Sequence, residues 1–178
     1  MTATRTPAPS SLPITLLVLD IDGVLTDGSI NLDDDGRETK RFCAADGVGL
    51  RTWQRLGYGV AVITGRGGSA VRHRLADLGV AEVVQASTDK AASLRSLAER
   101  TGVRPASMAY VGDDWPDRAP MRRVGYPIAV ANAAEQVKAV ARFVTAHRGG
   151  DGAVREAIEH LLDRMGRMGD ALALYDAP

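Results

Sequence analysis

The sequence predicts an α/β fold in which a mainly parallel sheet is flanked by helices on both faces. Short apolar runs typical of buried strands alternate with segments of helical periodicity, the order expected of repeated strand–helix units. The chain has 178 residues, of which 45% are hydrophobic and 25% charged. This length and composition are those of a single globular domain.

The apolar runs are the predicted strands. They are Ile14–Leu19, Val60–Ile63, Val83–Val84, Met108–Val111 and Ile128–Val130. Apolar residues at helical spacing indicate two helices between these runs. They are Val71, Leu75 and Leu78 in the first helix, and Ala91, Leu94, Leu97 and Ala98 in the second. Ser87 or Thr88 is the candidate N-cap of the second helix.

The last predicted helix has the clearest apolar stripe, formed by Val154, Ala157, Ile158, Leu161, Leu162 and Met165. Asp151 is its candidate N-cap, and we expect it to end near Gly166. Residues 1–13 are rich in Thr, Pro, Ala and Ser, so we expect a disordered N-terminal tail. The predicted domain is therefore residues 14–165, followed by a C-terminal tail at 166–178 whose few apolar residues do not indicate a structure.

One segment, Thr26–Phe42, interrupts the alternation of strands and helices. It holds an acidic run at 33–35, followed by Gly36, between short stretches of mixed polarity. This pattern predicts a β-hairpin that forms a small flap beside the first strand. The aspartates lack the ligand spacing and terminal glutamate of an EF-hand loop, which favours a solvated turn.

The charge balance argues against two classes of partner. Lys and Arg together number 22, as do Asp and Glu, so no net field exists to hold nucleic acid or an anionic membrane. No apolar run reaches membrane-spanning length, and the N-terminus lacks the apolar core of a signal peptide. The single cysteine, Cys43, leaves no disulfide framework. We expect a soluble cytoplasmic protein that acts on a small molecule.

Polar side chains follow the predicted strands at the points where the strands end. Asp20 and Asp22 follow the first run, Thr64 the second, and Asp113 with Asp114 the fourth. Ligands bind outside the carboxyl ends of the strands in an open parallel sheet, so these groups can converge on one small volume. Crowded carboxylates repel one another unless they share a cation, and Mg²⁺ prefers hard oxygen ligands of this kind.

The first aspartate pair is suited to phosphoryl transfer. If a metal ion neutralises the phosphate, the Asp20 carboxylate can approach phosphorus as a nucleophile. Asp22 is placed to act as a general acid and then as a general base. Gly23 permits the tight chain reversal that this arrangement requires. Alone, a pair of aspartates after a strand could equally cap a helix or a turn.

Two later positions can hold the phosphate. Thr64, with Gly65 and Arg66 behind it, offers a hydroxyl and backbone N–H groups at the start of a helix. Lys90 opens the next helix and can add a positive charge to the phosphate or the nucleophile. Taken singly, Thr64 could be a helix cap and Lys90 a solvated surface lysine.

In combination, these residues resemble the four motifs of the haloacid dehalogenase superfamily. The first motif is matched by Asp20–Val24, the second by Thr64, the third by Lys90, and the fourth by Gly112–Asp114 with Asp117. A more specific resemblance, to the 3-deoxy-D-manno-octulosonate 8-phosphate phosphatase family, covers residues 14–165. It rests on DIDGVLTDG at 20–28, ADGVGL at 45–50, VITGR at 62–66 and GGDGAVRE at 149–156.

The resemblance implies a Rossmann-like core without a cap domain, and a homotetramer in which neighbouring subunits help to close each active site. It implies that Asp20 becomes an aspartyl phosphate, with Asp22 as acid and base. Thr64 and Lys90 would be the phosphate and charge partners. Mg²⁺ would bind the carboxylates of Asp20 and Asp113 and the backbone carbonyl of Asp22.

The family's remaining site positions imply supporting and substrate-contacting roles. Asp114 would be a supporting carboxylate, and Asp117 would orient Lys90 or the loop. The backbone at Gly23 and Gly65 would lie beside the substrate. Arg66, and Arg155 within the 149–156 stretch, are the candidates for contacting a sugar acid, either within one chain or across a subunit boundary.

Three positions depart from the family's pattern. Trp115 and Pro116 replace an expected aliphatic pair, and Ala86 stands where the family often has glycine. The substrate could therefore be a related nonulosonate 9-phosphate, or another sugar or nucleotide phosphate. A non-catalytic domain that oligomerises with or regulates a sugar-activating enzyme is the alternative from another functional class. Dehalogenation is disfavoured, because it needs neither the second aspartate nor the carboxylate cluster.

Overall fold

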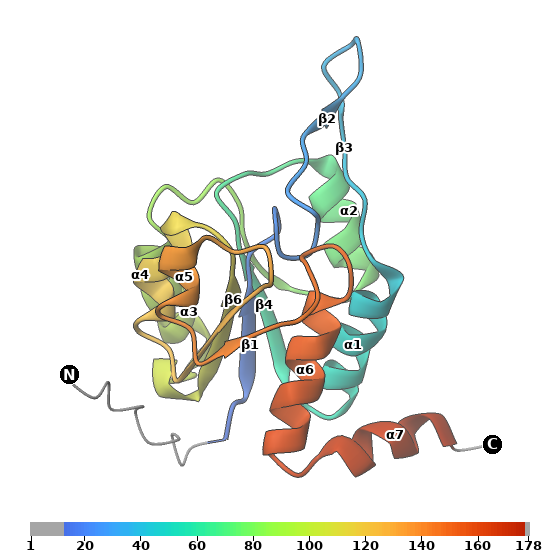
Figure 1. The fold of residues 1–178 in the computed structure, drawn as a ribbon, viewed down its shortest axis with the longest axis vertical. Helices are drawn as coiled ribbons and strands as arrows, with labels where there is room; N and C mark the ends of the chain where they lie inside the picture. The colour runs from blue at the N-terminus through green and yellow to red at the C-terminus, as the bar shows by residue number, and fades with distance from the viewer. Residues whose placement is uncertain (1–12, 177–178) are drawn as a thin grey trace.

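A parallel sheet lies at the centre of the computed structural model, which describes residues 13–176 (Figure 1). Within that range its strand order is β5-β4-β1-β6-β7-β8. The strands are β1 (Leu16–Leu19), β4 (Gly59–Ile63), β5 (Glu82–Val84), β6 (Met108–Gly112), β7 (Tyr126–Ala129) and β8 (Phe143–Val144). The predicted α/β fold is confirmed, whereas the tail predicted for residues 1–13 lies outside the described residues except for Pro13.

The central strand, β1, pairs in parallel with β4 on one side and β6 on the other. All its residues are buried, because helices cover both faces of the sheet. A strand covered on both faces is apolar throughout rather than alternating, which is why the apolar runs located the inner strands. The edge strand β8 was missed, since two residues are too few for a pattern to indicate.

Helices cover both faces of the sheet (Figure 1). On one face lie α1 (Ala44–Arg55), α2 (Ser69–Asp77) and α6 (Ala153–Arg164), and on the other lie α3 (Lys90–Thr101), α4 (Arg118–Met121) and α5 (Glu135–Lys138). None of the helices within residues 13–176 has the length and apolar character needed to cross a bilayer.

Both predicted helix caps were wrong by one or two residues. The N-cap of α3 is Asp89, whose Oδ1 accepts hydrogen bonds from the N–H groups of Ala91 and Ala92 at 2.9 and 3.0 Å. The N-cap of α6 is Gly152, which has no side chain to offer. The first backbone N–H groups of a helix have no partner within the helix, and here a side chain of α1 provides one. Asp46 Oδ1 accepts a hydrogen bond from the N–H of Arg155 at 2.8 Å.

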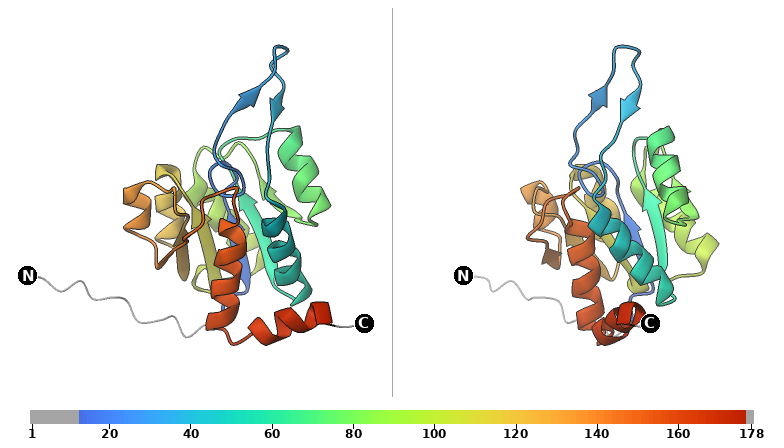
Figure 2. Two further views of the ribbon diagram at one scale, coloured as in Figure 1. Left: turned by 45° about the vertical axis from the view of Figure 1, so that its right-hand side comes forward. Right: turned by 90° about the vertical axis from the view of Figure 1, so that its right-hand side faces the viewer.

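The C-terminal segment, for which the sequence indicated no structure, forms helix α7 (Met168–Asp176). It runs past the end of α1 and α6 (Figure 2). Tyr175 Oη lies 2.7 Å from Thr52 Oγ1 in α1, and Arg55 donates to the carbonyl of Leu174 at 3.2 Å. These contacts come from residues more than a hundred positions earlier, so local periodicity could not report them.

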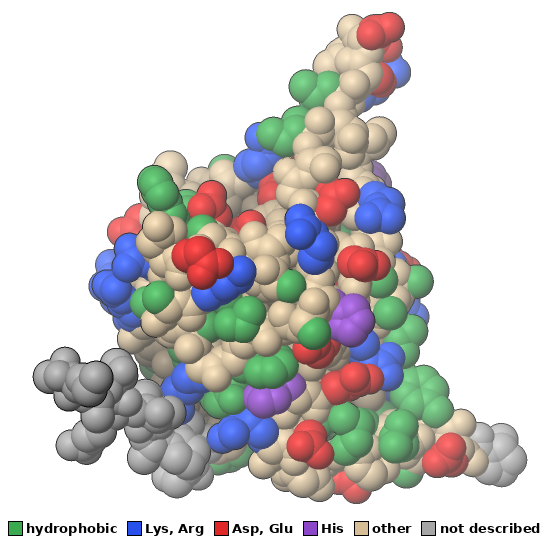
Figure 3. Space-filling model, in the orientation of Figure 1, with side chains coloured by type: hydrophobic (Ala, Val, Ile, Leu, Met, Phe, Trp, Pro, Cys, Tyr) green, Lys and Arg blue, Asp and Glu red, His purple; other side chains and the backbone are tan. Residues whose placement is uncertain are grey.

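The predicted hairpin is formed by β2 (Asn31–Leu32) and β3 (Glu38–Thr39), which pair antiparallel. It projects beyond the body of the domain (Figure 2). Charged side chains gather at its tip (Figure 3). Asp33 Oδ1 accepts from the N–H groups of Asp35 and Arg37 at 3.0 and 2.7 Å. The acidic run is therefore a solvated turn, as predicted.

Candidate active site

The carboxyl ends of β1, β4 and β6 open onto a cavity of about 490 Å³. Most of the predicted site residues line it, although they come from segments far apart in the chain. Those lining it are Asp20, Asp22, Thr64, Gly65, Arg66, Lys90, Asp113, Asp114 and Asp117. The polar groups that end separate strands therefore do converge on one volume.

Asp20 occupies the base of the cavity, directly after β1. Its N–H donates to the carbonyl of Val111 at 3.1 Å, which continues the sheet pairing by one residue. Asp20 Oδ2 lies 2.9 Å from Lys90 Nζ, at the first residue of α3. Burial, with a contribution from Asp117, raises the pKa of Asp20 to about 6, and Lys90 opposes the rise. The Lys90 ammonium favours the ionised carboxylate, the form that a nucleophile must have.

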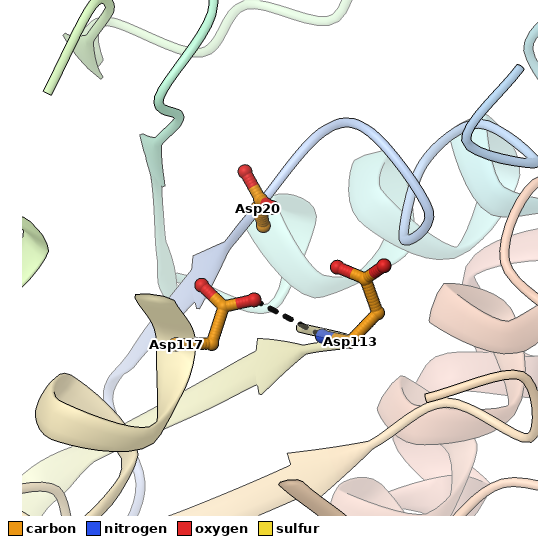
Figure 4. Close-up of side chains that lie close together, drawn as sticks. All are labelled: Asp20, Asp113 and Asp117. Carbon is orange, nitrogen blue, oxygen red and sulfur yellow. Dashed lines mark hydrogen bonds between the residues drawn. The ribbon is translucent and has the colours of Figure 1, made fainter. Parts of the chain in front are cut away.

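Asp117 is the anchor of this charge cluster and is fully buried. Its Oδ1 accepts from Lys90 Nζ at 2.7 Å and from Tyr110 Oη at 2.8 Å. Its Oδ2 accepts from the N–H groups of Asp113 and Asp114 at 3.0 and 3.3 Å, and Figure 4 shows the first of these bonds. Asp117 thus positions Lys90 and the loop after β6 together. Tyr110, a core strand residue, carried no sequence signal for this contact.

The side chains of Asp20 and Asp113 fit a bound divalent cation. Each has one buried oxygen, Oδ1, that no described residue hydrogen-bonds. Burial first, and then the charges of Asp117 and Asp20, raise the pKa of Asp113 to about 8. Although one carboxylate oxygen from each of Asp20, Asp113 and Asp117 lies within 4.8 Å of the others, both Asp117 oxygens are already hydrogen-bonded. The free ligand atoms are those of Asp20 and Asp113, hard oxygens of the type that Mg²⁺ prefers.

Gly23 turns the chain tightly beside this cluster. It has φ +86°, and a Cβ there would lie 2.0 Å from Asp113 Oδ2. The Gly23 carbonyl accepts from Asn132 Nδ2 at 3.2 Å, while a Cβ on Gly149 would lie 1.8 Å from that carbonyl oxygen. The glycines at 23 and 149 therefore let two backbone segments approach closely behind the metal-ligand candidates.

Asp22 faces the flap. Its Oδ1 lies 2.5 Å from Nζ of Lys40, a residue that follows β3, and its Oδ2 lies 3.6 Å from Nε of Arg66. Glu38 Oε1 contacts both cations, at 3.0 Å from Lys40 and 2.9 Å from Arg66. Sequence reasoning missed Lys40 and Glu38, because charged residues in a short polar hairpin are usually solvated.

Thr64 lies at the end of β4 and is buried. Its N–H donates to the carbonyl of Val84 at 2.9 Å, and its Oγ1 accepts from the N–H of Arg66 at 3.3 Å. Nearby, Ala86 has φ +55°, the left-handed conformation that favours glycine. This explains physically why glycine would be expected at position 86.

Arg155 does not line the cavity of its own chain. Its Nε donates a hydrogen bond to Oε1 of Glu159, four residues along the same helix, at 2.6 Å. The aliphatic part of its side chain packs against Gly49, where an added Cβ would lie 3.0 Å from Arg155 Cδ. The wider 149–156 stretch supports the Asp22–Gly23 loop from behind, since the N–H of Gly150 donates to the carbonyl of Val24 at 3.0 Å. Within one chain, this stretch braces the site rather than contacting its contents.

The fourth-motif loop places its unusual residues at the cavity rim. Pro116 lines the cavity, whereas Trp115 is 66% exposed and donates from Nε1 to Gln136 at 3.2 Å. Asp114 caps the short helical turn at Trp115–Asp117, with its Oδ1 accepting from the N–H of Trp115 at 2.8 Å. Asp114 therefore shapes the loop that carries Asp117.

Comparison with known proteins identifies the family. Residues 77–158 match the sequence model of the haloacid dehalogenase-like hydrolases. The 3-deoxy-D-manno-octulosonate 8-phosphate phosphatase KdsC of Escherichia coli K12 is 40% identical over 158 residues, which are 89% of this chain and 84% of the relative. At this identity and coverage the two chains share a family.

Two crystal structures show the same fold over nearly the whole chain. A 3-deoxy-D-manno-octulosonate 8-phosphate phosphatase from Moraxella catarrhalis, in complex with a magnesium ion, a phosphate ion and a KDO molecule, is 37% identical. The TM-score is 0.89, with 92% of this chain and 94% of that one covered. A probable YrbI family phosphatase from Pseudomonas syringae is 38% identical with a TM-score of 0.91, covering 95% and 96%. The chain belongs to the haloacid dehalogenase-like hydrolases and is a phosphatase that acts on phosphate monoesters.

Proposed function

We propose that this enzyme hydrolyses the phosphate ester of a small 2-keto-3-deoxy sugar acid, through an aspartyl phosphate at Asp20 and with Mg²⁺. The observation that carries the proposal is that two carboxylates lining the cavity, Asp20 and Asp113, each have a buried Oδ1 that the described residues leave without a hydrogen-bond partner. The Moraxella relative that holds magnesium, phosphate and KDO supports the same assignment.

In the proposed reaction, Asp20 attacks phosphorus and the bond to the leaving sugar oxygen breaks. Lys90, held by Asp117, keeps the attacking carboxylate in place and balances part of its charge. The N–H groups and hydroxyl around Thr64 bind phosphate oxygens. A bound Mg²⁺ on Asp20, Asp113 and the Asp22 carbonyl would neutralise the phosphate charge that the carboxylates otherwise repel.

Asp22 handles the protons in both halves of the reaction. It donates a proton to the leaving oxygen in the first step, and it removes one from the attacking water in the second. That water hydrolyses the phosphoryl group from Asp20 and restores the free carboxylate. Arg66, which lines the cavity and whose side chain is half exposed, is placed to contact the sugar acid.

We also propose that the enzyme works as a homotetramer in the cytoplasm, with a neighbouring subunit completing each site. Large apolar side chains on the flap, Ile30 and Leu32, are 56% and 62% exposed, and Trp115 is exposed beside the cavity. A second subunit over the flap would bury this surface. Light scattering on the purified chain would test the tetramer, and a monomer at micromolar concentration would refute it.

The function is tested by phosphate release from a panel of phosphorylated sugar acids, sugars and nucleotides, with and without Mg²⁺. We expect magnesium-dependent release that is fastest on 3-deoxy-D-manno-octulosonate 8-phosphate. Asp20→Asn should abolish release while the protein stays folded, with Asp34→Asn in the solvated turn as the matched control. Release on other phosphates alone would refute the substrate class, and no release on any would refute catalysis.

A further inference from the structure

Strand β3 of the flap and the residue just after it bring two charged residues against Asp22 and Arg66, which line the cavity, and neither belongs to the motifs. The Lys40 side chain is only 1% exposed, and its Nζ lies 2.5 Å from Asp22 Oδ1 and 3.0 Å from Glu38 Oε1. Glu38 and Lys40 are two positions apart, so their side chains leave the same side of the extended chain. The flap therefore contacts Asp22 through an ion pair that its neighbours shield from water.

Other charges on the same hairpin behave differently. Arg37 pairs with Asp33 and Asp35 in the turn, but its side chain is 76% exposed, and such pairs contribute little because water screens them. Burial tends to lower the pKa of Lys40, yet Asp22 and Glu38 outweigh that effect and hold the pKa above its usual value. Lys40 is thus a charged group confined to one geometry, and Arg37 is not.

Glu38 explains how two cations can approach one aspartate. Its Oε1 lies between Lys40 and Arg66, at 3.0 and 2.9 Å. Asp22 then makes a short contact with Lys40 through Oδ1 and a longer one, 3.6 Å, with Arg66 through Oδ2. The Oδ2 contact is the weaker of the two, because Arg66 is half exposed and its pairing with Glu38 is shorter. Oδ2 is therefore the oxygen that a substrate can most readily engage.

We propose that Lys40, held by Glu38, is a positioning residue for Asp22, which fixes Oδ1 so that Oδ2 is presented to the leaving oxygen of the substrate. The flap then contributes to the proton-transfer step itself, besides covering the cavity. This inference rests on the proposed role of Asp22 as acid and base. It assigns Glu38 the role of holding the Lys40 ammonium in place.

The test compares Lys40→Met, Lys40→Arg and the matched control Arg37→Met, all on the hairpin, in steady-state hydrolysis of 3-deoxy-D-manno-octulosonate 8-phosphate with Mg²⁺. Since positioned acid–base groups contribute about 10²–10⁴-fold, we expect Lys40→Met to lower kcat about tenfold or more. KM should change less than about threefold, because the loss falls on the transition state. Lys40→Arg should recover much of the loss, and Arg37→Met should match the wild type.

A double-mutant cycle separates positioning of Asp22 from a general structural effect. If Lys40 acts through Asp22, then adding Lys40→Met to Asp22→Asn should change kcat less than about twofold, since the two changes remove one function. The proposal would be overturned if Lys40→Met had the wild-type kcat. It would also be overturned if the fold-losses in kcat of the two single variants multiplied in full in the double variant. A loss confined to KM would overturn it too.

Amide hydrogen exchange distinguishes failure of this inference from failure of the proposed function. If the wild type hydrolyses neither this substrate nor p-nitrophenyl phosphate, the proposed function is wrong, and the contact is then tested by exchange alone. Amides of residues 21–28 and 31–40 should exchange faster in Lys40→Met than in Arg37→Met. Equal exchange in the two variants would overturn the inference whatever the activity.

Discussion

The site pairs a lysine with an aspartate twice, once on the sheet and once on the flap. Lys90 opens helix α3 and joins Asp20 to the fully buried Asp117, within the core. Lys40 joins Asp22 to Glu38 from a hairpin whose strands have two residues each. A hairpin of this size is not stable alone. The first set, Lys90, Asp20 and Asp117, is the sheet half of the site, and the fold preorganises it. The second set, Lys40, Asp22 and Glu38, is the flap half, and its own charges hold it in place.

Removal of Asp117 tests how strongly the sheet half depends on the core. Asp117→Ala leaves the buried Lys90 ammonium, the Tyr110 hydroxyl and two backbone N–H groups without that acceptor. Losing one partner of a buried ion pair typically costs about 3–5 kcal/mol. We expect a fall of about 3 kcal/mol in the free energy of unfolding, measured by urea denaturation. The exposed Asp114→Ala should cost about 1 kcal/mol, the value of a cap, and equal losses would show that Asp117 is not the anchor.

Gly23→Ala tests whether the sheet half tolerates displacement. The added Cβ would lie 2.0 Å from Asp113 Oδ2, at a φ that disfavours alanine. Because misplacing a catalytic group by about 1 Å can cost about 10²-fold, kcat should fall by about that factor. Higher magnesium should restore part of the loss if Asp113 is a ligand. Gly36→Ala, at φ +74° with open space around it, is the control for backbone strain alone.

The carboxylate cluster predicts that magnesium raises the free energy of unfolding by an amount that depends on pH. Burial raises the pKa of Asp113 from 3.8 to about 8 and that of Asp20 to about 6. Raised acidic pKa values stabilise the fold fully at low pH, and that stability is lost as pH rises through them. In EDTA, the free energy of unfolding should therefore fall between pH 5 and 8.5.

Magnesium should offset that fall, by about 2.7 kcal/mol at a hundred times its Kd. This magnesium-dependent stabilisation should grow with pH over this range. Urea denaturation with and without the ion would measure it. Asp113→Asn should flatten both curves. A benefit that is independent of pH and insensitive to Asp113→Asn would refute the metal assignment.

The smallest expected effect concerns the loop that joins β5 to α3. Ala86 has φ +55°, a conformation that costs roughly 1 kcal/mol for residues with a Cβ. Ala86→Gly should raise the free energy of unfolding by about 1 kcal/mol or less, because glycine's extra backbone entropy in the unfolded chain offsets part of the gain. Kinetic constants should not change, since the backbone geometry is kept. A destabilised variant would show that Ala86 is not strained.

Sequence reasoning located the sheet half of the site and missed most of the flap half. Asp20, Thr64 and Asp113 each follow an apolar run, so their positions at predicted strand ends marked them as site candidates. Lys40 and Glu38 lie in a polar hairpin, where charges usually meet only water. Motif context also marked Arg155 for substrate contact, but it did not indicate that the backbone N–H of Arg155 bonds to Asp46 at the start of α6.

By itself the sequence determined the parallel sheet, the hairpin flap and the carboxylates at the strand ends, because these are encoded in local runs and fixed spacings. Only the tertiary structure decided which carboxylate oxygens have hydrogen-bond or ion-pair partners. It placed Tyr110 and Lys90 on Asp117, left Oδ1 of Asp20 and of Asp113 without a partner among the described residues, and set Lys40 against Asp22. Such pairings depend on distances between segments remote in the chain, and residue order carries no direct measure of those distances.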